Sequence, residues 1–265
     1  MNFIERTIGK GGPSVAIVGS MHGDEKIGER VIARLRGLEL EQGTVSFINA
    51  HPEALKKHVR FIERDLNRSF PGKKNGVIEE QLAFKLKRHL RGFDVVIDLH
   101  TTRSDIGSLI IFTRDSTAMR ELLGRVPIKK VALIGSHIFG GHEMVNHTPL
   151  GISLEYGPDT NGKSSVRAAR DIKALLVNLG MVAGRRRRML KKVMYTVSGR
   201  YEVKGKVRPK AGLRDFRFIK KGQSIGSTEE GNLKARYSFY PLFLGRGRYE
   251  GTFALAAKTK QIVQL

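Results

Sequence analysis

Short apolar runs alternate with amphipathic stretches through the first part of the chain. Compact apolar runs bounded by turn residues favour buried strands, and they predict strands over residues 14–19, 44–48, 94–99 and 108–112. Between these runs, apolar residues spaced three or four apart predict helices over residues 25–38 and 77–90. Strands that alternate with helices are typical of an α/β domain.

A further helix is expected after Ser164, which we interpret as its N-cap. From there apolar residues recur at helical spacing as far as Leu179, and Gly180 is expected to end the helix. This helix would close the first domain.

The pattern changes in the last part of the chain. From Tyr195 onward, short apolar runs alternate with Gly, Pro and Lys, which predicts a small β domain. Residues 184–192, with the sequence GRRRRMLKK, lie between the two parts. We interpret this charge run as a solvated basic linker; the alternative is a binding patch for nucleic acid or an acidic lipid.

Composition restricts the chemistry. The 265 residues include no cysteine, which excludes disulfides, iron–sulfur clusters and a cysteine nucleophile. Any metal must therefore be bound by His, Asp and Glu. The 48 Lys and Arg outnumber the 25 Asp and Glu, for a formal net charge of +23, so anionic substrates or partners need consideration.

The charge and the histidines are unevenly distributed. Residues 184–265 carry 21 basic and 5 acidic side chains, whereas all eight histidines lie before residue 184. Imidazole chemistry therefore belongs to the first part. The start of the chain is charged at Glu5 and Arg6, where a secretory signal needs an apolar run, and no apolar run is long enough to span a bilayer. We expect a cytoplasmic protein without a membrane partner.

Candidate chemistry first appears directly after the first predicted strand. There, His22 and Glu25 are three residues apart in the sequence HGDE, so an imidazole nitrogen and a carboxylate oxygen could reach one point. Taken alone, this spacing is more often a surface feature. Its position matters, however, because ligands bind at the carboxyl ends of strands in α/β sheets.

A second group follows the strand over residues 94–99. Asp98 and His100 share one face of that strand, and His100 would emerge beside the HGDE loop. Two histidines and one glutamate form the three-ligand set of a catalytic zinc site, which leaves a position for water. Asp98 or Asp24 could orient an imidazole.

Two more segments add polar groups. The segment RFIERDLNR, residues 60–68, supplies arginines that can pair with carboxylates. In LEYGP, Glu155 is the single acid at the end of a short apolar run, where a carboxylate can act as a general base.

Together, HGDE, RFIERDLNR, DLHTT and LEYGP resemble the succinylglutamate desuccinylase/aspartoacylase family of the zinc carboxypeptidase superfamily. Four such motifs in this order are specific in combination. The resemblance implies a zinc-carboxypeptidase-like mixed sheet flanked by helices, plus a small C-terminal β domain. It assigns a zinc hydrolase catalytic domain to residues 1–183 and the β domain to residues 193–265, joined by the basic linker over residues 184–192.

Carried over to this chain, the resemblance implies one Zn²⁺ per chain, hydrolysis of a small-molecule N-acyl amino acid, and a role for each matching residue. Glu155 would be the general base and acid, and Arg60 would stabilise the oxyanion. The implied zinc ligands are His22, Glu25 and His100, and the implied substrate-carboxylate ligands are Asn67 and Arg68.

The chain also departs from the family pattern. The aspartoacylases recognise the acyl carboxylate with a Tyr and an Arg upstream of the general base, but the stretch IFGGHEMVNHTPLG, residues 138–151, contains neither. Where those enzymes have a substrate-contacting Tyr in the C-terminal domain, this chain has Arg248, with Tyr249 one residue further on. The acyl group is therefore left open between succinyl, aspartyl, acetyl and others.

Two alternative functions accompany this interpretation, and one further motif is set aside. A metallocarboxypeptidase acting on peptides would use much the same site. A non-enzymatic nucleic-acid-binding protein with a vestigial metal site would use the basic C-terminal part, although no defined RNA-binding motif is present. His142, Glu143 and His147 suggest a zinc helix, but the second histidine is one position too far along, so we expect a loop there.

Overall fold

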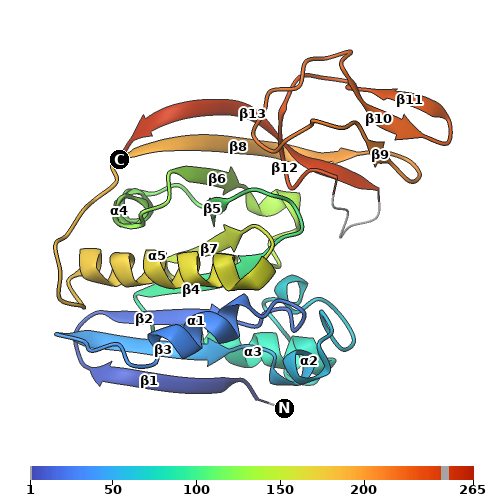
Figure 1. Cartoon of the computed structure of the whole chain (residues 1–265). Coiled ribbons are helices and arrows are strands. Elements are labelled where there is room, and N and C mark those ends of the chain that lie inside the picture. The colour runs from blue at the N-terminus through green and yellow to red at the C-terminus, as the bar shows by residue number, and fades with distance from the viewer. Residues whose placement is uncertain (1, 246–250) are drawn as a thin grey trace.

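The computed structural model describes residues 2–245 and 251–265. One long mixed sheet crosses the molecule, and a smaller sheet lies at its far end (Figure 1). The large sheet has ten strands in the order β1-β3-β2-β4-β7-β5-β6-β8-β13-β12, and the small sheet has three in the order β11-β10-β9.

The strands of the large sheet are β1 (Ile4–Lys10), β2 (Ser14–Gly19), β3 (Gly43–Asn49), β4 (Val95–Thr101), β5 (Ser108–Phe112), β6 (Lys130–Ile134), β7 (Gly151–Tyr156), β8 (Lys191–Glu202), β12 (Tyr240–Leu242) and β13 (Thr252–Gln264). The small sheet contains β9 (Arg208–Pro209), β10 (Ser224–Thr228) and β11 (Gly231–Lys234). The α-helices are α1 (Ile27–Leu35), α2 (Pro52–Lys57), α3 (Ile78–Leu90), α4 (Thr117–Arg125) and α5 (Lys163–Leu179). Short 3₁₀ turns are η1 (Leu66–Arg68), η2 (Ser136–Ile138), η3 (Met144–His147) and η4 (Thr160–Gly162).

The middle of the large sheet is parallel. Strand β2 runs parallel to β3 and β4, and β4 runs parallel to β7. The sheet is mixed because β1 is antiparallel to β3 on one side of this parallel region and β5 is antiparallel to β7 on the other. Because β2, β4 and β7 are parallel neighbours, their carboxyl ends lie along one edge of the sheet.

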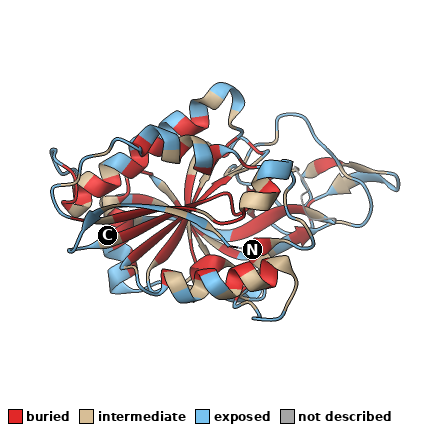
Figure 2. Ribbon diagram, turned by 90° about the horizontal axis from the view of Figure 1, so that it is seen from below, coloured by how far each residue is buried: buried red, intermediate tan, exposed pale blue. Residues whose placement is uncertain are grey.

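Helices cover both faces of the sheet, and the buried strands lie between them (Figure 2). Buried side chains of α1, α4 and α5 pack on one face. Those of α3 pack on the other face, together with Leu66 and Phe70. The middle strands are covered on both sides, which explains why they read as continuous apolar runs in the sequence.

Most predicted elements of the first part exist. The helix expected over residues 77–90 is α3 and the strand over residues 108–112 is β5. The N-cap prediction at Ser164 is wrong, because α5 begins at Lys163 and the Ser164 hydroxyl instead donates to the carbonyl oxygen of Pro158 at 3.0 Å. Gly180 ends the helix as predicted, with a φ of 77° that favours glycine.

The fold class is confirmed: a mixed α/β sheet flanked by helices is followed by a small C-terminal β sheet. The C-terminal strands β8, β13 and β12 also extend the large sheet through the parallel pairing of β6 with β8. Lys191 and Lys192 belong to β8. The division of the chain at residues 184–192 stays a prediction.

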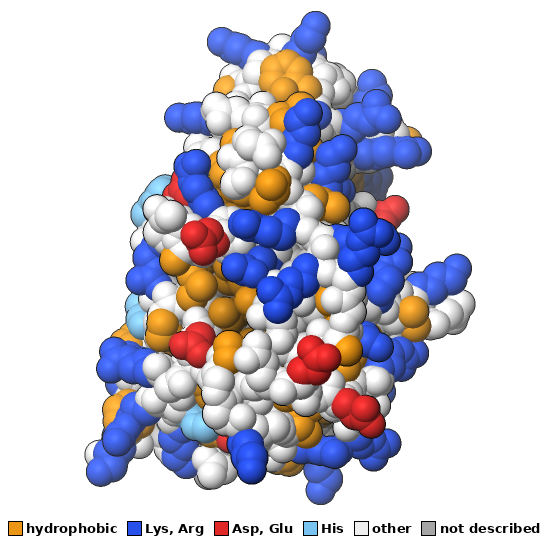
Figure 3. All heavy atoms as spheres, turned by 90° about the vertical axis from the view of Figure 1, so that its left-hand side faces the viewer, with side chains coloured by type: hydrophobic (Ala, Val, Ile, Leu, Met, Phe, Trp, Pro, Cys, Tyr) orange, Lys and Arg blue, Asp and Glu red, His pale blue; other side chains and the backbone are white. Residues whose placement is uncertain are grey.

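Positive side chains are spread over the surface. On the face shown in Figure 3, Lys and Arg clearly outnumber Asp and Glu. None of the helices in the described part of the chain combines the length and apolar character that a membrane crossing requires.

Candidate metal centre and hydrolytic site

The predicted metal ligands come from two neighbouring parallel strands. His22 and Glu25 lie in the loop after β2, and His100 is the penultimate residue of β4. Glu155 lies on β7 directly opposite His100 in the strand pairing. The parallel order of β2, β4 and β7 therefore brings together residues that are far apart in the chain.

The loop that carries His22 and Glu25 is tightly packed. Ser20 has a positive φ of 54°, which turns the chain away from the end of β2. Gly23 lies against α2 so closely that a Cβ atom there would be 2.1 Å from the backbone of Ala54. Its N–H donates to the carbonyl oxygen of Arg60 at 3.2 Å. The glycine therefore allows this loop to contact both α2 and the arginine-bearing segment.

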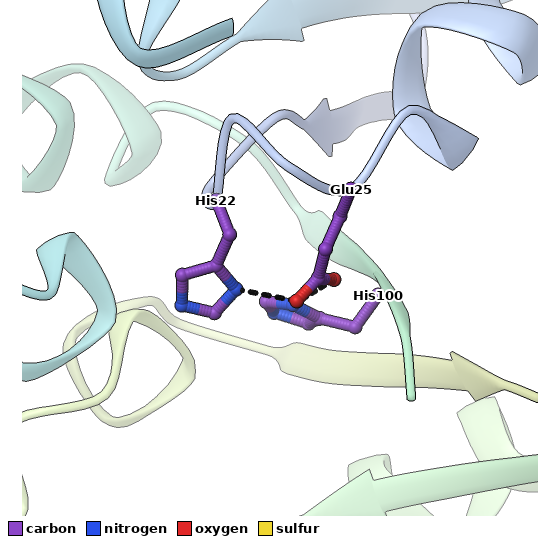
Figure 4. A group of neighbouring side chains, drawn as sticks. All are labelled: His22, Glu25 and His100. Atoms are coloured by element: carbon purple, nitrogen blue, oxygen red, sulfur yellow. Dashed lines mark hydrogen bonds and ion pairs between the residues drawn. The ribbon is translucent and has the colours of Figure 1, made fainter. Parts of the chain in front are cut away.

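His22, Glu25 and His100 converge on one point and are all buried (Figure 4). One ligand atom from each lies within 4.8 Å of the other two. Nδ1 of His22 is 2.9 Å from Oε1 of Glu25, and Nδ1 of His100 is 3.2 Å from Oε2 of the same carboxylate. The N–H of Thr101 donates to Oε2 of Glu25 at 2.8 Å and fixes its orientation.

Each imidazole contacts a second carboxylate through its other nitrogen. Nε2 of His100 lies 2.7 Å from Oδ2 of Asp98, and Nε2 of His22 lies 3.0 Å from Oδ1 of Asp65. Asp98 is thus placed as expected, whereas Asp24 is exposed to solvent. Sequence reasoning missed Asp65. The position of Asp65 within the RFIERDLNR motif was the sequence feature that could have identified it.

These contacts shift the pKa values of the cluster. Burial raises the pKa of Glu25, but His22 and His100 outweigh this and hold that pKa well below its usual range. Burial also lowers the pKa of His100, whereas Asp98 and Glu25 raise it well above its ordinary value. Burial likewise raises the pKa of Asp65, but His22 and Arg60 outweigh it and the pKa is lowered.

The donor set fits a divalent cation. Two imidazoles and one carboxylate are the ligand types of catalytic zinc sites, and a carboxylate on the outer nitrogen of each imidazole is the usual second layer of such sites. When Nε2 donates to Asp65 or Asp98, Nδ1 of each ring is left to face Glu25. A cation would also compensate the charge of these buried carboxylates.

Arg60 lies at the same centre. Its guanidinium donates from Nη1 to Oε1 of Glu25 at 3.1 Å and from Nη2 to Oδ2 of Asp65 at 3.0 Å. The side chain lines the cavity beside the candidate metal ligands. Arg60 therefore lies next to the candidate metal ligands.

A side chain of α3 holds the segment that carries Arg60 through hydrogen bonds. The buried carboxylate of Glu79 accepts hydrogen bonds from the N–H groups of Ile62, Glu63 and Arg64, and it lies 3.0 Å from Nε2 of His51. Backbone N–H groups held this way fix the path of the loop. Glu79 had no signal in the sequence apart from its place on a predicted helix.

Asn67 and Arg68 occupy the next turn, η1, which Asp65 caps by accepting from the N–H of Asn67 at 2.9 Å. The Asn67 side chain accepts from the N–H of Met144 at 2.9 Å, and its Nδ2 is 3.4 Å from Nε2 of His100. The Arg68 guanidinium lies 4.3 Å from the centre of the Phe139 ring. Both residues line the cavity.

Glu155 lines the same cavity from β7. Burial raises the pKa of Glu155 to about 7, and the charge of His100 opposes this shift. A carboxyl group in this range can both accept and return a proton near neutral pH. Glu155 therefore lies beside the candidate metal ligands, opposite His100 on the neighbouring strand.

The rest of the cavity is mainly apolar. It has a volume of about 150 Å³. Sequence reasoning did not identify its apolar lining, because these residues come from separate parts of the chain: β5, β6, the segment between η2 and η3, η3 itself, the residue after β12, and β13. They are Ile111, Ile134, Phe139, Val145, Phe243 and Leu255.

The remaining sequence candidates lie elsewhere. His142 and His147 donate to the carbonyl oxygens of Phe70 and Gly141, at 2.7 and 2.9 Å, in an irregular segment. They belong to no metal-capable cluster among the described residues. Arg248 and Tyr249 lie outside the described residues, and their proposed substrate contacts stay predictions.

Comparison with known proteins agrees with this geometry. The model of the succinylglutamate desuccinylase/aspartoacylase catalytic domain matches residues 11–131. An N-acyl-aromatic-L-amino acid amidohydrolase from Xenopus tropicalis is 27% identical over 188 residues, which cover 61% of this chain and 60% of that protein. A probable aspartoacylase from Nostoc is 24% identical over 94% of this chain and 97% of its own length.

Solved structures share the fold. Murine aminoacylase 3 has a TM-score of 0.76 at 20% identity, with 96% of this chain and 99% of that chain covered. A succinylglutamate desuccinylase/aspartoacylase from Rhodobacter sphaeroides has a TM-score of 0.76 at 21% identity, with 97% and 88% covered.

The fold and the site define an aspartoacylase-like α/β protein with a buried two-histidine, one-glutamate cluster at the carboxyl edge of its sheet. Residues 11–131 of the chain match the catalytic domain of the succinylglutamate desuccinylase/aspartoacylase family, and the four sequence motifs and the fold agree with that match.

Proposed function

We propose that this protein is a zinc-dependent hydrolase that releases an amino acid from an N-acyl amino acid. The observation that carries the proposal is the convergence of His22, Glu25 and His100 in a cavity that also contains Glu155 and Arg60. The relatives support the reaction class, since they are named as an amidohydrolase and an aspartoacylase.

The ion would be held by His22, Glu25 and His100. When bound, zinc polarises a carbonyl oxygen and lowers the pKa of a coordinated water. Asp65 and Asp98 keep the two imidazoles in the orientation that this requires.

The chain's own residues supply the remaining steps. Glu155 accepts a proton from the attacking water and returns it to the nitrogen of the leaving amine. Arg60 stabilises the negative charge that develops on the carbonyl oxygen of the substrate. Asn67 and Arg68 bind the carboxylate of the amino acid, for which a guanidinium is well shaped.

The apolar part of the cavity indicates what else the substrate carries. A cavity of about 150 Å³ lined by aliphatic and aromatic side chains accommodates a group the size of benzene. The lining therefore supports an apolar acyl group or an apolar amino-acid side chain. The name of the Xenopus relative, which acts on N-acyl-aromatic amino acids, agrees with this preference.

The proposal is tested by measuring amine release from N-acetyl, N-succinyl and N-formyl derivatives of phenylalanine, leucine and glutamate. We expect release that stops with a chelator and returns when Zn²⁺ is added, with the apolar derivatives preferred. Release that is insensitive to a chelator would contradict zinc dependence. Cleavage of peptides without cleavage of N-acyl amino acids would favour the carboxypeptidase alternative.

A further inference from the structure

A second concave surface lies in the C-terminal part, next to the candidate active site. This groove is formed by the end of β8, the loop over residues 203–207 and the start of β13, and Thr252 lines both the groove and the active-site cavity. Its volume of about 1110 Å³ exceeds the roughly 300–1000 Å³ of typical small-molecule pockets. The groove is therefore large enough for an extended partner.

The charge of the groove is strongly positive. Its lining includes one carboxylate among the described residues, that of Glu202, and four cationic side chains: Arg200, Lys204, Lys206 and Arg236. Glu202 is paired with Arg200 at 3.2 Å. Neither lysine forms an ion pair within the described part of the chain, so the groove complements an anion.

Two tyrosine rings, those of Tyr201 and Tyr237, lie beside Arg236. The guanidinium of Arg236 lies 5.0 Å from the centre of the Tyr201 ring, and the backbone N–H of Arg236 donates to the Tyr201 hydroxyl at 2.8 Å. The Tyr237 ring packs 5.1 Å from that of Tyr201, yet 40% of Tyr237 is exposed. An exposed arginine is thus next to a ring with an open surface.

We propose that this groove, together with Tyr237, binds single-stranded nucleic acid. Cationic grooves follow the phosphate backbone, and exposed aromatic rings stack on bases that are not paired. An acidic peptide would match the charge but has no regular flat group to cover the ring. A membrane surface is better matched by large exposed apolar side chains around the cations, whereas the accessible apolar residues that line this groove are Val203, Val207 and Pro209.

Net charge alone does not locate this site. Lys and Arg are also numerous on the face of the molecule in Figure 3, so weak binding to any polyanion is expected there. The test must therefore compare variants that remove equal charge at different places. Lys163 and Lys173, both exposed on α5, provide the matched control for Lys204 and Lys206.

The experiment measures fluorescence anisotropy of a labelled 20-nucleotide oligo(dT) with the full chain at salt concentrations from 50 to 200 mM. We expect the double variant Lys204→Ala/Lys206→Ala to bind more weakly and to reduce the slope of log K against log salt by about 1.4. The control Lys163→Ala/Lys173→Ala should retain the slope of the unchanged protein.

The ring is tested separately. Tyr237→Ala should weaken binding by roughly 5- to 160-fold with an unchanged salt slope, because stacking contributes about 1–3 kcal/mol per base. Tyr237→Phe should keep the affinity. Circular dichroism of each variant verifies that the chain is folded.

Several outcomes would overturn the proposal: no binding by the unchanged chain, equal losses in the two lysine pairs, or no effect of Tyr237→Ala. Duplex DNA, polyglutamate or anionic phosphatidylserine vesicles binding as tightly as oligo(dT) would also overturn it. Binding is measured without substrate, so the result is independent of the proposed hydrolase activity.

Discussion

Oδ1 of Asp65 lies 3.0 Å from Nε2 of His22. Through its other oxygen the same carboxylate accepts from Arg60, so it connects a candidate metal ligand with the candidate oxyanion group. Both distances lie within the normal range of hydrogen bonds. One carboxylate therefore positions two parts of the site.

We predict that Asp65→Asn lowers the affinity for Zn²⁺ by about 10- to 100-fold, the usual effect of losing a partner of a metal-ligating histidine. Competition with a chromogenic zinc chelator measures this change. The matched control is Asp24→Asn, which removes an exposed carboxylate from the loop that carries His22. Equal zinc affinities in the two variants would refute the role of Asp65.

Arg60→Ala should reduce turnover by about 100- to 1000-fold, because one donor to the developing oxyanion is lost. Zinc content, measured by atomic emission, should stay at one ion per chain. Arg64→Ala is the control: this arginine is in the same segment but pairs with Glu80, and its loss should have little effect on turnover. Full activity of Arg60→Ala would show that its proposed role is wrong.

Glu155→Gln should be more damaging than Arg60→Ala, since an amide cannot relay a proton between water and the leaving amine. Rapid-quench measurement of the single turnover isolates this step from product release. Glu143→Gln, which changes another carboxyl group of the same cavity outside the candidate metal ligands, serves for comparison. If the two glutamine variants were equally active, Glu155 would not be the proton relay.

Lys192 gives a prediction about stability and pH. It is fully buried and donates to the carbonyl oxygens of Val126 and Ile128 at 2.6 and 2.7 Å. Burial lowers the pKa of Lys192 from 10.5 to about 7. Between these two values the unfolded chain binds more protons than the folded chain, so the contribution of Lys192 to folding stability rises with pH.

We therefore expect the stability of the unchanged protein, relative to Lys192→Met, to increase from pH 7 to pH 10. Urea unfolding at several pH values measures the difference. The neighbouring Lys191→Met changes an exposed lysine and should show no such trend. If the difference in unfolding free energy between the unchanged protein and Lys192→Met did not vary with pH, the lowered pKa of Lys192 would be contradicted.

Much of the first part of the fold was predictable. Residues 94–99 are mainly apolar, with Val95, Val96 and Ile97 in succession, because β4 is covered on both faces, and that pattern can be recognised without knowledge of the neighbouring strands. Helix α3 was also predictable from a local pattern, because its apolar residues repeat at helical spacing. In contrast, the N-cap predicted at Ser164 lies two residues earlier, at Gly162, and the Ser164 hydroxyl donates to the carbonyl oxygen of Pro158 in the preceding loop.

The pairing of the C-terminal strands with the large sheet could not be predicted. Strand β8 joins β6 through long-range hydrogen bonds that leave no local pattern in either segment. The same applies to Glu79, whose carboxylate holds a loop some fifteen residues away in the chain. Contacts of this kind depend on how separate elements pack.

The sequence by itself determined the chemistry that is available: no thiols, two imidazoles and a carboxylate near strand ends, and an excess of positive charge toward the C-terminus. The tertiary structure decided what those groups can do together. The parallel order of β2, β4 and β7 brings His22, Glu25, His100 and Glu155 to one edge of the sheet. Residue types are local properties, whereas the distances between their atoms arise from strand pairing and burial across the whole fold.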